Sequence, residues 1–337
     1  MVTIKDISSK TGYSIATVSK ALNHTGRIPE ETRKIVLKTA EELGYVPNYS
    51  ARFLKTTESW TIGIIYEGIA NLGLFHPYFS RVLEYFRKEV EAKGYDMLFL
   101  SKNFGAHHLS YLEHARMKGV DGILVVCGPM GDPSFTEVFE SNLPSVVIDH
   151  ISPSTTTVTS KSDVSIHEMI EKLKACGHKE IAYVHGSTNS FIGKSRMDNF
   201  MDAMHNHGLK VSDKLLVEAR YYSRNDGQDA VSKLMTLKKT PSAIFCASDD
   251  VALGVIDGLK QLNIKVPEDV SVIGFDGIKD DVYGEMKLGF IKQEMKSIGV
   301  HAAHEILNQM NLKEKVKNKV VYIDTTFEAN DTVSKCK

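Results

Sequence analysis

Short apolar runs alternate with longer amphipathic stretches from residue 60 onward. Alternation of this kind predicts parallel sheets with helices on both faces. The strands are expected, in two series, at Thr61–Tyr66, Tyr95–Leu100, Gly122–Cys127 and Ser145–Asp149, then at Glu180–His185, Leu215–Ala219, Ala243–Ala247 and Val270–Phe275. The helices between them include Tyr78–Lys93, Ser162–Cys176, Lys194–His207, Asn225–Leu237 and Val251–Leu262. Two series predict two similar lobes. Ligands bind beyond the carboxyl ends of such strands, so we expect a shared cleft there.

The first 58 residues have a different pattern, that of three short helices. Thr3 and Asp6 have the spacing of a capping box, and Ser14 can cap a second helix that runs to Asn23. A tight turn at Gly12 separates these two helices, and a third begins near Pro29 and ends at Gly44. Two short helices joined by a glycine turn are typical of a helix-turn-helix. The predicted fold is therefore a small all-α helix-turn-helix domain followed by an α/β body of two doubly wound lobes.

Charge divides the chain in the same place. Residues 1–58 have a net charge of +3, and the remaining residues of the 337 have a net charge of −4. A basic module on an acidic body is compatible with a nucleic-acid contact at one end, although charge alone does not require one. Neither a signal peptide nor a membrane-spanning run is visible, and the four cysteines form no CxxC pair. We therefore expect a cytoplasmic protein without a disulfide framework.

An ordered set of motifs resembles the lactose/galactose-repressor (LacI/GalR) family. The motifs are Thr17–Asn23, Glu31–Arg33, Leu43–Asn48, His76–Phe79, Gly177-His178, Ser248–Gly254, Val272–Asp276 and Ile291–Gln293. The resemblance implies a transcription regulator with a periplasmic-binding-protein-like body and crossovers near 159, 291 and 319. The expected domains are 1–46 for the helix-turn-helix, 47–59 for a hinge, 60–158 with 292–318 for the first lobe, and 159–291 with 319–332 for the second.

The second helix is the expected DNA-recognition helix, because such helices contact base edges through their N-terminal side chains. Ile15 and Ala16 can offer only apolar contact, for example to a thymine methyl. The alternative is that Ile15 packs inside the unit, a role that Val18 and Leu22 fit better by helical spacing. The complete DNA-binding prediction comprises Thr3, Ser14, Ile15, Ala16, Thr17, Ser19, Lys20, Asn23, Asn48, Ala51, Arg52 and Leu54.

Residues 47–54 are predicted to be a hinge that folds on DNA, since helices this short are marginal in water. The resemblance implies a hinge helix in the minor groove, with Leu54 wedged into the central base step. The alternative is a plain linker with one buried leucine. One helix-turn-helix offers little contact area, so a two-fold homodimer on palindromic double-stranded DNA is expected. Residues 327–337 contain no leucine heptad, which favours a dimer over a tetramer.

The resemblance also maps an effector site onto the two lobes. It comprises Tyr78, Phe79, Asp149, Arg196, Tyr222, Ser248 and Asp276. Carboxylates and a guanidinium can orient hydroxyl groups, and aromatic faces suit a sugar ring. Tyr78 and Phe79 could instead belong to the core, and Arg196 could be a surface charge. Asp276 is harder to explain structurally, because a carboxylate that ends a buried strand needs partners.

Two departures from the family bear on the effector. Ser248 stands where many members have a longer asparagine, and Ser190 stands where purine-responsive members have an arginine. We therefore expect a sugar or sugar derivative as effector, with a purine or nucleoside as the alternative. The prediction is a repressor of sugar-utilisation genes.

Two other classes of protein fit the sequence less well. No GxGxxG, P-loop, HExxH or GxSxG pattern is present, so an enzyme, a cofactor and a metal site are not expected. A free-standing sugar-binding protein would need a secretory signal in place of residues 1–58.

Overall fold

The computed structural model describes residues 2–23, 25–45, 58–67, 74, 76–105, 107–220, 222–278 and 286–336. Internal contacts divide the chain into two units, Met1–Ser59 and Trp60–Lys337. Each unit has its own hydrophobic core.

The first unit contains the three expected helices, α1 (Ile4–Thr11), α2 (Ile15–Leu22) and α3 (Glu30–Glu42). One buried side chain or more from each helix forms the core, which comprises Ile7, Val18, Ala21, Val36 and Ala40. Gly12 turns the chain between α1 and α2 with a φ of 74°, a conformation that side chains with a Cβ rarely adopt. The Ser14 hydroxyl accepts a hydrogen bond of 3.1 Å from the Thr17 amide, which confirms Ser14 as the cap of α2.

The second unit contains two six-stranded sheets. The strand order of the first sheet is β13-β7-β6-β5-β1-β2, and all its pairings are parallel. Its strands are β1 (Thr61–Tyr66), β2 (Asp96–Phe99), β5 (Gly122–Cys127), β6 (Ser145–Ile148), β7 (Thr156–Lys161) and β13 (Lys319–Asp324). The short strands β3 (Asn103–Phe104) and β4 (His107–His108) pair separately.

The second sheet has the order β14-β12-β11-β10-β8-β9, with β14 antiparallel at its edge. Its strands are β8 (Ile181–His185), β9 (Leu216–Glu218), β10 (Ala243–Cys246), β11 (Ser271–Asp276), β12 (Gly289–Lys292) and β14 (Thr326–Glu328). A 3-10 turn at Asp213–Leu215 precedes β9.

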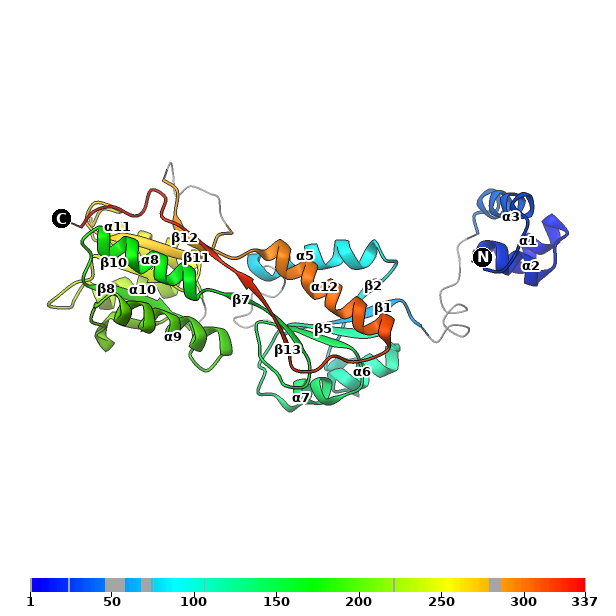
Figure 1. Ribbon diagram of the computed structural model, residues 1–337, viewed down its shortest axis with the longest axis horizontal. Helices are drawn as coiled ribbons and strands as arrows, with labels where there is room; N and C mark the ends of the chain where they lie inside the picture. The colour runs from blue at the N-terminus through cyan, green and yellow to red at the C-terminus, as the bar shows by residue number, and fades with distance from the viewer. Residues whose placement is uncertain are drawn as a thin grey trace. The chain divides into compact units, whose positions relative to one another are not determined.

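Helices cover both faces of each sheet (Figure 1). In the first lobe, α5 (Pro77–Glu91) and α12 (Met295–Leu312) pack on one face, and α6 (Tyr111–Lys118) and α7 (Pro133–Glu140) on the other. In the second lobe, α8 (Asp163–Ala175) and α9 (Phe191–Asn206) are opposite α10 (Arg224–Leu234) and α11 (Asp249–Gln261). The two-lobed α/β architecture is therefore confirmed. Among the described residues, no helix has both the length and the apolar character needed to span a membrane.

The chain passes between the lobes three times, after β7, after β12 and after β13. The third crossover differs from the expected one near 319. Backbone pairing with β7 along the whole of β13 puts Lys319–Asp324 in the first sheet, whereas the predicted boundary assigned these residues to the second lobe. The crossover segments are hydrogen-bonded to one another. The Thr325 amide donates to the Lys161 carbonyl at 3.1 Å, and the Ser160 hydroxyl donates to the side-chain oxygen of Gln293.

Candidate functional site: a polar cleft between two lobes

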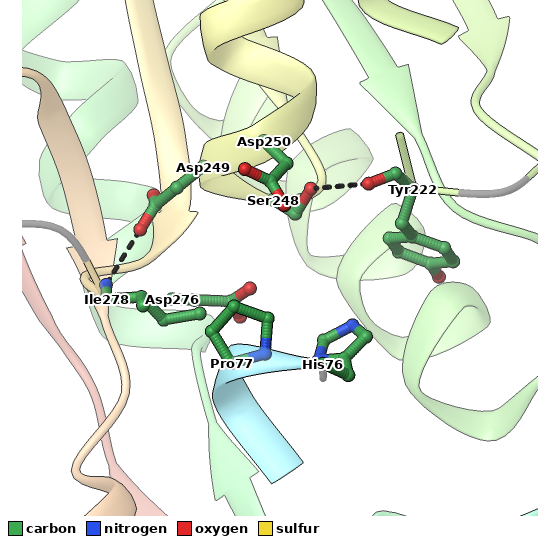
Figure 2. A pocket seen from close by; sticks show the side chains of 8 residues that line it. All are labelled: His76, Pro77, Tyr222, Ser248, Asp249, Asp250, Asp276 and Ile278. Atoms are coloured by element: carbon green, nitrogen blue, oxygen red, sulfur yellow. Dashed lines mark hydrogen bonds between the residues drawn. The ribbon is translucent and has the colours of Figure 1, made fainter. Parts of the chain in front are cut away.

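A small pocket, partly open to solvent, lies between the two lobes. The first lobe contributes the start of α5 (Figure 2). The second lobe contributes the carboxyl end of β11, the loop before α10 and the start of α11. The lining residues are His76, Pro77, Tyr222, Ser248, Asp249, Asp250, Asp276 and Ile278. The pocket therefore lies at the carboxyl ends of the second sheet's strands, as the topology requires.

Asp149 is held in place by two hydroxyl groups of the first lobe. Tyr78 donates to one carboxylate oxygen at 2.8 Å, and Thr159 donates to the other at 2.9 Å. Burial raises the pKa of Asp149, and the hydrogen bond from Tyr78 and the charge of Arg196 oppose that rise. Burial and this carboxylate in turn raise the pKa of Tyr78 well above its usual value. Tyr78 is 3% exposed and belongs to the first lobe's hydrophobic core, and neither it nor Asp149 is among the described residues that line the pocket.

Arg196 supplies the positive charge of the cleft from α9. Its guanidinium carbon lies 3.6 Å from the centre of the Phe275 ring, a cation–π contact, and one of its nitrogens donates to the Ala247 carbonyl at 3.3 Å. The side chain is 7% exposed, so Arg196 is not a surface charge. Its charge opposes the pKa rise of both Asp149, in the first lobe, and Asp276, in the second.

Asp276 ends β11 inside the pocket. The Gln293 side-chain amide donates to its carboxylate at 2.6 Å. Burial raises the pKa of Asp276 to about 7, against the opposing effects of Arg196 and Gln293. Nearby Asp149 and Asp250 act in the same direction as burial. The carboxyl group therefore changes its charge near neutral pH, and a ligand that donates hydrogen bonds would favour the ionised form.

Three predicted effector residues have positive φ angles although none is glycine. The values are 57° for Asp149, 53° for Tyr222 and 107° for Asp276. Such conformations cost about 1–3 kcal/mol each and persist only where the surrounding structure imposes them. They occur here at the ends of β6 and β11 and just before α10. Other non-glycine residues with positive φ, such as Asn263 and Lys313, lie outside the site, so such backbone is not confined to the cleft.

Phe79 and Ser248 differ from the other predicted residues. Phe79 packs edge-on against Tyr66, with ring centroids 5.8 Å apart, and belongs to the first lobe's hydrophobic cluster. The Ser248 hydroxyl lines the pocket but accepts a hydrogen bond of 3.2 Å from the Val251 amide, as the cap of α11. Phe79 thus fits the core alternative, and the Ser248 oxygen already has a structural role.

Several residues of the site were not predicted. They are His76, Pro77, Asp249, Asp250, Ile278 and Gln293. All of these except Ile278 fall within motifs that the sequence singled out, so membership of a motif was an available signal. The Asp249 carboxylate accepts a hydrogen bond of 2.8 Å from the Ile278 amide, so this oxygen already has a partner within the protein.

The predicted recognition residues lie on the surface at the start of α2. Ile15 is 49% exposed, and Ser14, Ala16 and Lys20 are exposed beside it. Thr17 and Ser19 are partly buried. Thr3 and Asn23 have local partners, since Thr3 donates to Asp6 at 2.8 Å and the Asn23 amide donates to the Ser19 carbonyl at 2.8 Å. Asn48, Ala51, Arg52 and Leu54 lie outside the described residues. Within the described part of the chain, no cluster of His, Cys, Asp and Glu could hold a metal ion.

Comparisons with known proteins agree with this architecture over nearly the whole chain. Residues 59–330 match the periplasmic binding proteins and sugar binding domain of LacI family, and residues 3–48 match the bacterial regulatory proteins of the lacI family. The chain is 30% identical over 336 residues to the probable HTH-type transcriptional repressor ExuR of Bacillus subtilis (strain 168), covering 99% of this chain and 98% of that protein. It is 30% identical over 319 residues to the HTH-type transcriptional repressor PurR of Pasteurella multocida (strain Pm70), covering 94% of each. The lac repressor dimer bound to operator and the anti-inducer ONPF has the same fold, with a TM-score of 0.83 at 20% identity over 99% of both chains.

A helix-turn-helix unit joined in sequence to a two-lobed body with a polar cleft defines a ligand-regulated DNA-binding protein. The chain belongs to the LacI family of bacterial regulatory proteins. Members of this family are transcriptional repressors rather than enzymes, and they bind operator DNA as dimers together with a small-molecule effector. The protein is accordingly a DNA-binding transcriptional repressor with a ligand-binding body.

Proposed function

We propose that this repressor controls sugar-utilisation genes in the cytoplasm, as a homodimer whose operator affinity is set by a sugar or sugar derivative in the cleft. The observation that carries the proposal is the electrostatic coupling of Asp149, Arg196 and Asp276, which come from different elements of both lobes. Asp276 lines the pocket, and the charges of the other two act on its carboxyl group. A ligand that contacts all three would hold the lobes in one arrangement.

The chemistry of these groups suits a polyhydroxylated ligand. Each carboxylate accepts hydrogen bonds from hydroxyl groups, and the guanidinium donates in a fixed plane. Tyr222 lines the same pocket and offers an aromatic face for the apolar side of a sugar ring. Van der Waals contact and directed hydrogen bonds together select a ring of defined stereochemistry.

The charge of the cleft further favours a neutral sugar. Three carboxylates, those of Asp249, Asp250 and Asp276, line the pocket, and its described lining includes no lysine or arginine. These carboxylates in their ionised form would repel an anionic ligand, and a bound anion would raise the pKa of Asp276 further. A phosphorylated or carboxylated sugar is therefore a poorer fit.

Ser190 is the position that weighs against a purine effector. Its hydroxyl accepts from the Gly193 amide at 3.0 Å and caps α9, the helix that bears Arg196. Purine-responsive members of the family have an arginine at the position of Ser190. A serine has neither the positive charge nor the length of that arginine. A purine or nucleoside remains the competing effector for the experiment below.

The DNA-binding half of the proposal places α2 in the major groove. Ser14, Ile15, Ala16, Thr17 and Ser19 would face base edges, with Thr3, Lys20 and Asn23 beside the backbone. Residues 47–59 form the hinge, in which Asn48, Ala51 and Arg52 contact the minor groove and Leu54 forms the wedge. Residues 1–46 are then the DNA-binding domain. The lobe boundaries are those predicted from the sequence, with 159–161 and 319–324 moved to the first lobe and 292 moved to the second.

The regulatory mechanism would be a population shift between two lobe arrangements. A ligand that prefers one arrangement changes the spacing of the two hinges in the dimer. Operator affinity then changes by the same coupling free energy, typically about 1–3 kcal/mol. The hydrogen bonds between Asp276, Gln293 and Ser160 supply a physical route from the cleft to the crossovers.

Thermal unfolding of the full-length protein against neutral sugars, sugar phosphates, uronic acids and purines tests the effector class. A ligand present at about 100 times its dissociation constant stabilises the native state by roughly 2.7 kcal/mol. We expect a shift with a neutral sugar that disappears in Asp276→Asn, and a change in operator binding with the same compound. A shift with purines alone, or with none of these compounds, would overturn the sugar assignment.

A further inference from the structure

Residues 330–336, the tail segment, are hydrogen-bonded to the second lobe at the edge away from the cleft. Thr332 is fully buried, and its hydroxyl donates to the Val272 carbonyl at 2.6 Å and accepts from the Gly289 amide at 2.7 Å. Two residues later, the Ser334 amide donates to the Ser271 hydroxyl at 3.0 Å. The tail segment is therefore fixed in register against β11 as far as Ser334.

His178 joins the tail segment to the turn that follows α8. One ring nitrogen lies 2.9 Å from the Ser334 carbonyl oxygen, and the other lies 2.9 Å from the Ser242 hydroxyl. Burial lowers the pKa of His178, and the ring is 2% exposed. A neutral buried imidazole with a partner on each side is a rigid bridge. It positions the residues just before it next to those just after Ser334.

Cys176 and Cys336 meet at this place. The Cys336 amide donates to the Cys176 carbonyl at 2.8 Å, and the Cys336 Cβ lies 3.6 Å from the position that a Cβ on Gly177 would occupy. An amide nitrogen lies about 1.5 Å and a carbonyl oxygen about 2.4 Å from its own Cα, so this hydrogen bond limits the separation of the two Cα atoms to about 6.7 Å. Disulfides join Cα atoms about 4.4–6.8 Å apart. The two cysteines therefore satisfy the backbone requirement for a disulfide.

Exposure distinguishes this pair from the other two cysteines. Cys176 and Cys336 are both partly exposed, whereas Cys127 is 6% and Cys246 is 0% exposed. Oxidants and small thiols reach exposed sulfurs and not buried ones. The fold thus brings the backbones of its two partly exposed cysteines together and keeps the other two in the cores of the lobes.

We propose that Cys176 and Cys336 form a reversible disulfide that fastens the tail segment to α8. The oxidant is a low-molecular-weight disulfide such as oxidised glutathione. One cysteine thiolate attacks it, forms a mixed disulfide and releases one glutathione thiolate. The second cysteine thiolate then attacks the protein sulfur of that mixed disulfide and releases the other glutathione. Two cysteine thiols are oxidised, two electrons pass to the small disulfide, and two protons accompany its reduction to two thiols.

The inference is independent of the effector and of its class. Cytosolic disulfides are usually transient and redox-sensing, so a pair of this kind would report oxidation rather than maintain the fold. The bond would close a loop of about 160 residues, a length at which restriction of the unfolded chain is large. Oxidation should accordingly raise the melting temperature of the body.

The test uses the full-length protein, oxidised glutathione and a thiol-blocking reagent, followed by peptide mass spectrometry. We expect one peptide pair linked through Cys176 and Cys336, loss of two reactive thiols, and a melting temperature higher by roughly 5 °C that dithiothreitol reverses. Cys176→Ser and Cys336→Ser should each abolish the shift and leave a glutathione adduct on the remaining cysteine. Cys127→Ala, at a buried site, should retain both the linked peptide and the shift.

Three outcomes would overturn the proposal. The first is glutathione adducts on both cysteines of the wild-type protein with no internal link. The second is an intermolecular disulfide, visible as a covalent dimer on a non-reducing gel. The third is a melting shift that survives in Cys176→Ser.

Discussion

The side-chain amide of Gln293 donates a hydrogen bond of 2.6 Å to the carboxylate of Asp276. Asp276 faces the pocket, whereas Gln293 lies in the crossover between β12 and α12 and is 2% exposed. Gln293 also accepts from Ser160, at the end of β7 beside another crossover. A ligand that competes for the Asp276 carboxylate therefore acts directly on the segments about which the lobes would move.

Replacing Gln293 with Leu should uncouple the two sites. The variant retains the bulk of the side chain but loses its hydrogen bonds to Asp276 and Ser160, so the effector should change operator affinity by less than in the wild type. A loss of about 1 kcal/mol of coupling corresponds to roughly a fivefold smaller effect. Operator titrations with and without effector measure this quantity. Ser297→Ala, on α12 outside the pocket, is the control, and equal coupling in all three proteins would contradict a role for Gln293.

Asp276→Asn should remove the effector response while operator binding persists. The amide cannot accept hydrogen bonds at both of its polar atoms, and a buried site built for a carboxylate loses roughly 2–3 kcal/mol of ligand binding. Calorimetric titration and operator binding are the two measurements. Asp257→Asn is the matched control, because this carboxylate pairs with Arg224 and does not line the pocket. A normal response in Asp276→Asn would remove Asp276 from the site.

The raised pKa of Asp276 predicts a pH dependence of stability. Its pKa is about 7 in the folded protein and about 3.9 in an unfolded chain. The folded state therefore binds the proton more tightly, and this group's contribution to stability is fully present below about pH 4 and is lost as the pH rises to about 7. Urea unfolding of the wild type should show this decline, and Asp276→Asn should lack it. Asp276→Asn should be more stable than the wild type by about 1–3 kcal/mol at pH 8.

The same titration predicts that effector binding weakens in acid. A sugar hydroxyl donates best to the ionised carboxylate, so affinity should fall as the pH is lowered through about 7. Titrations at pH 6 and pH 8 with the effector found in the thermal screen measure the change. Equal affinity at the two pH values would show that the ligand does not distinguish the ionised form.

Ile15 and Val18 provide a matched pair within one helix. Ile15 is 49% exposed and Val18 is fully buried. Ile15→Ala should leave the melting temperature nearly unchanged and weaken operator binding roughly 5- to 30-fold, or about 1–2 kcal/mol. Val18→Ala should destabilise the helix-turn-helix unit by roughly 2 kcal/mol. Circular dichroism and fluorescence anisotropy separate the two effects, and unaltered operator affinity in Ile15→Ala would argue against base contact.

Leu54→Ala tests the hinge. Removal of an intercalating side chain should reduce specific operator binding by about 1–3 kcal/mol and leave effector affinity intact. Parallel titrations with operator and with unrelated DNA measure the loss of specificity. An operator affinity equal to that of the wild type would favour the plain-linker alternative.

Apolar patterning was sufficient for most of the two sheets. All eight expected strands occur, with ends within one residue of those predicted. Most of them are apolar runs buried on both faces, whereas the edge strands β2 and β9 are partly exposed. Strand β7 was not predicted, because its residues are mostly polar and form no apolar run. Thr156, Thr157 and Thr159 are fully buried there, and Thr157 donates to the His150 carbonyl at 2.7 Å. Only a folded neighbour can satisfy such hydroxyls, so no local pattern marks the strand.

The sequence by itself determined the helix-turn-helix, the two lobes and the edge of the sheets at which a ligand would bind, since caps, turns and apolar periodicity act over a few residues. Tertiary structure decided which polar groups meet. Tyr78 and Asp149 are 71 residues apart and share a hydrogen bond of 2.8 Å, and Gln293 reaches Asp276 across a crossover. It also moved Phe79 into the core and β13 into the first sheet. Contacts between distant segments depend on how whole elements pack, and that information is not local to any stretch of chain.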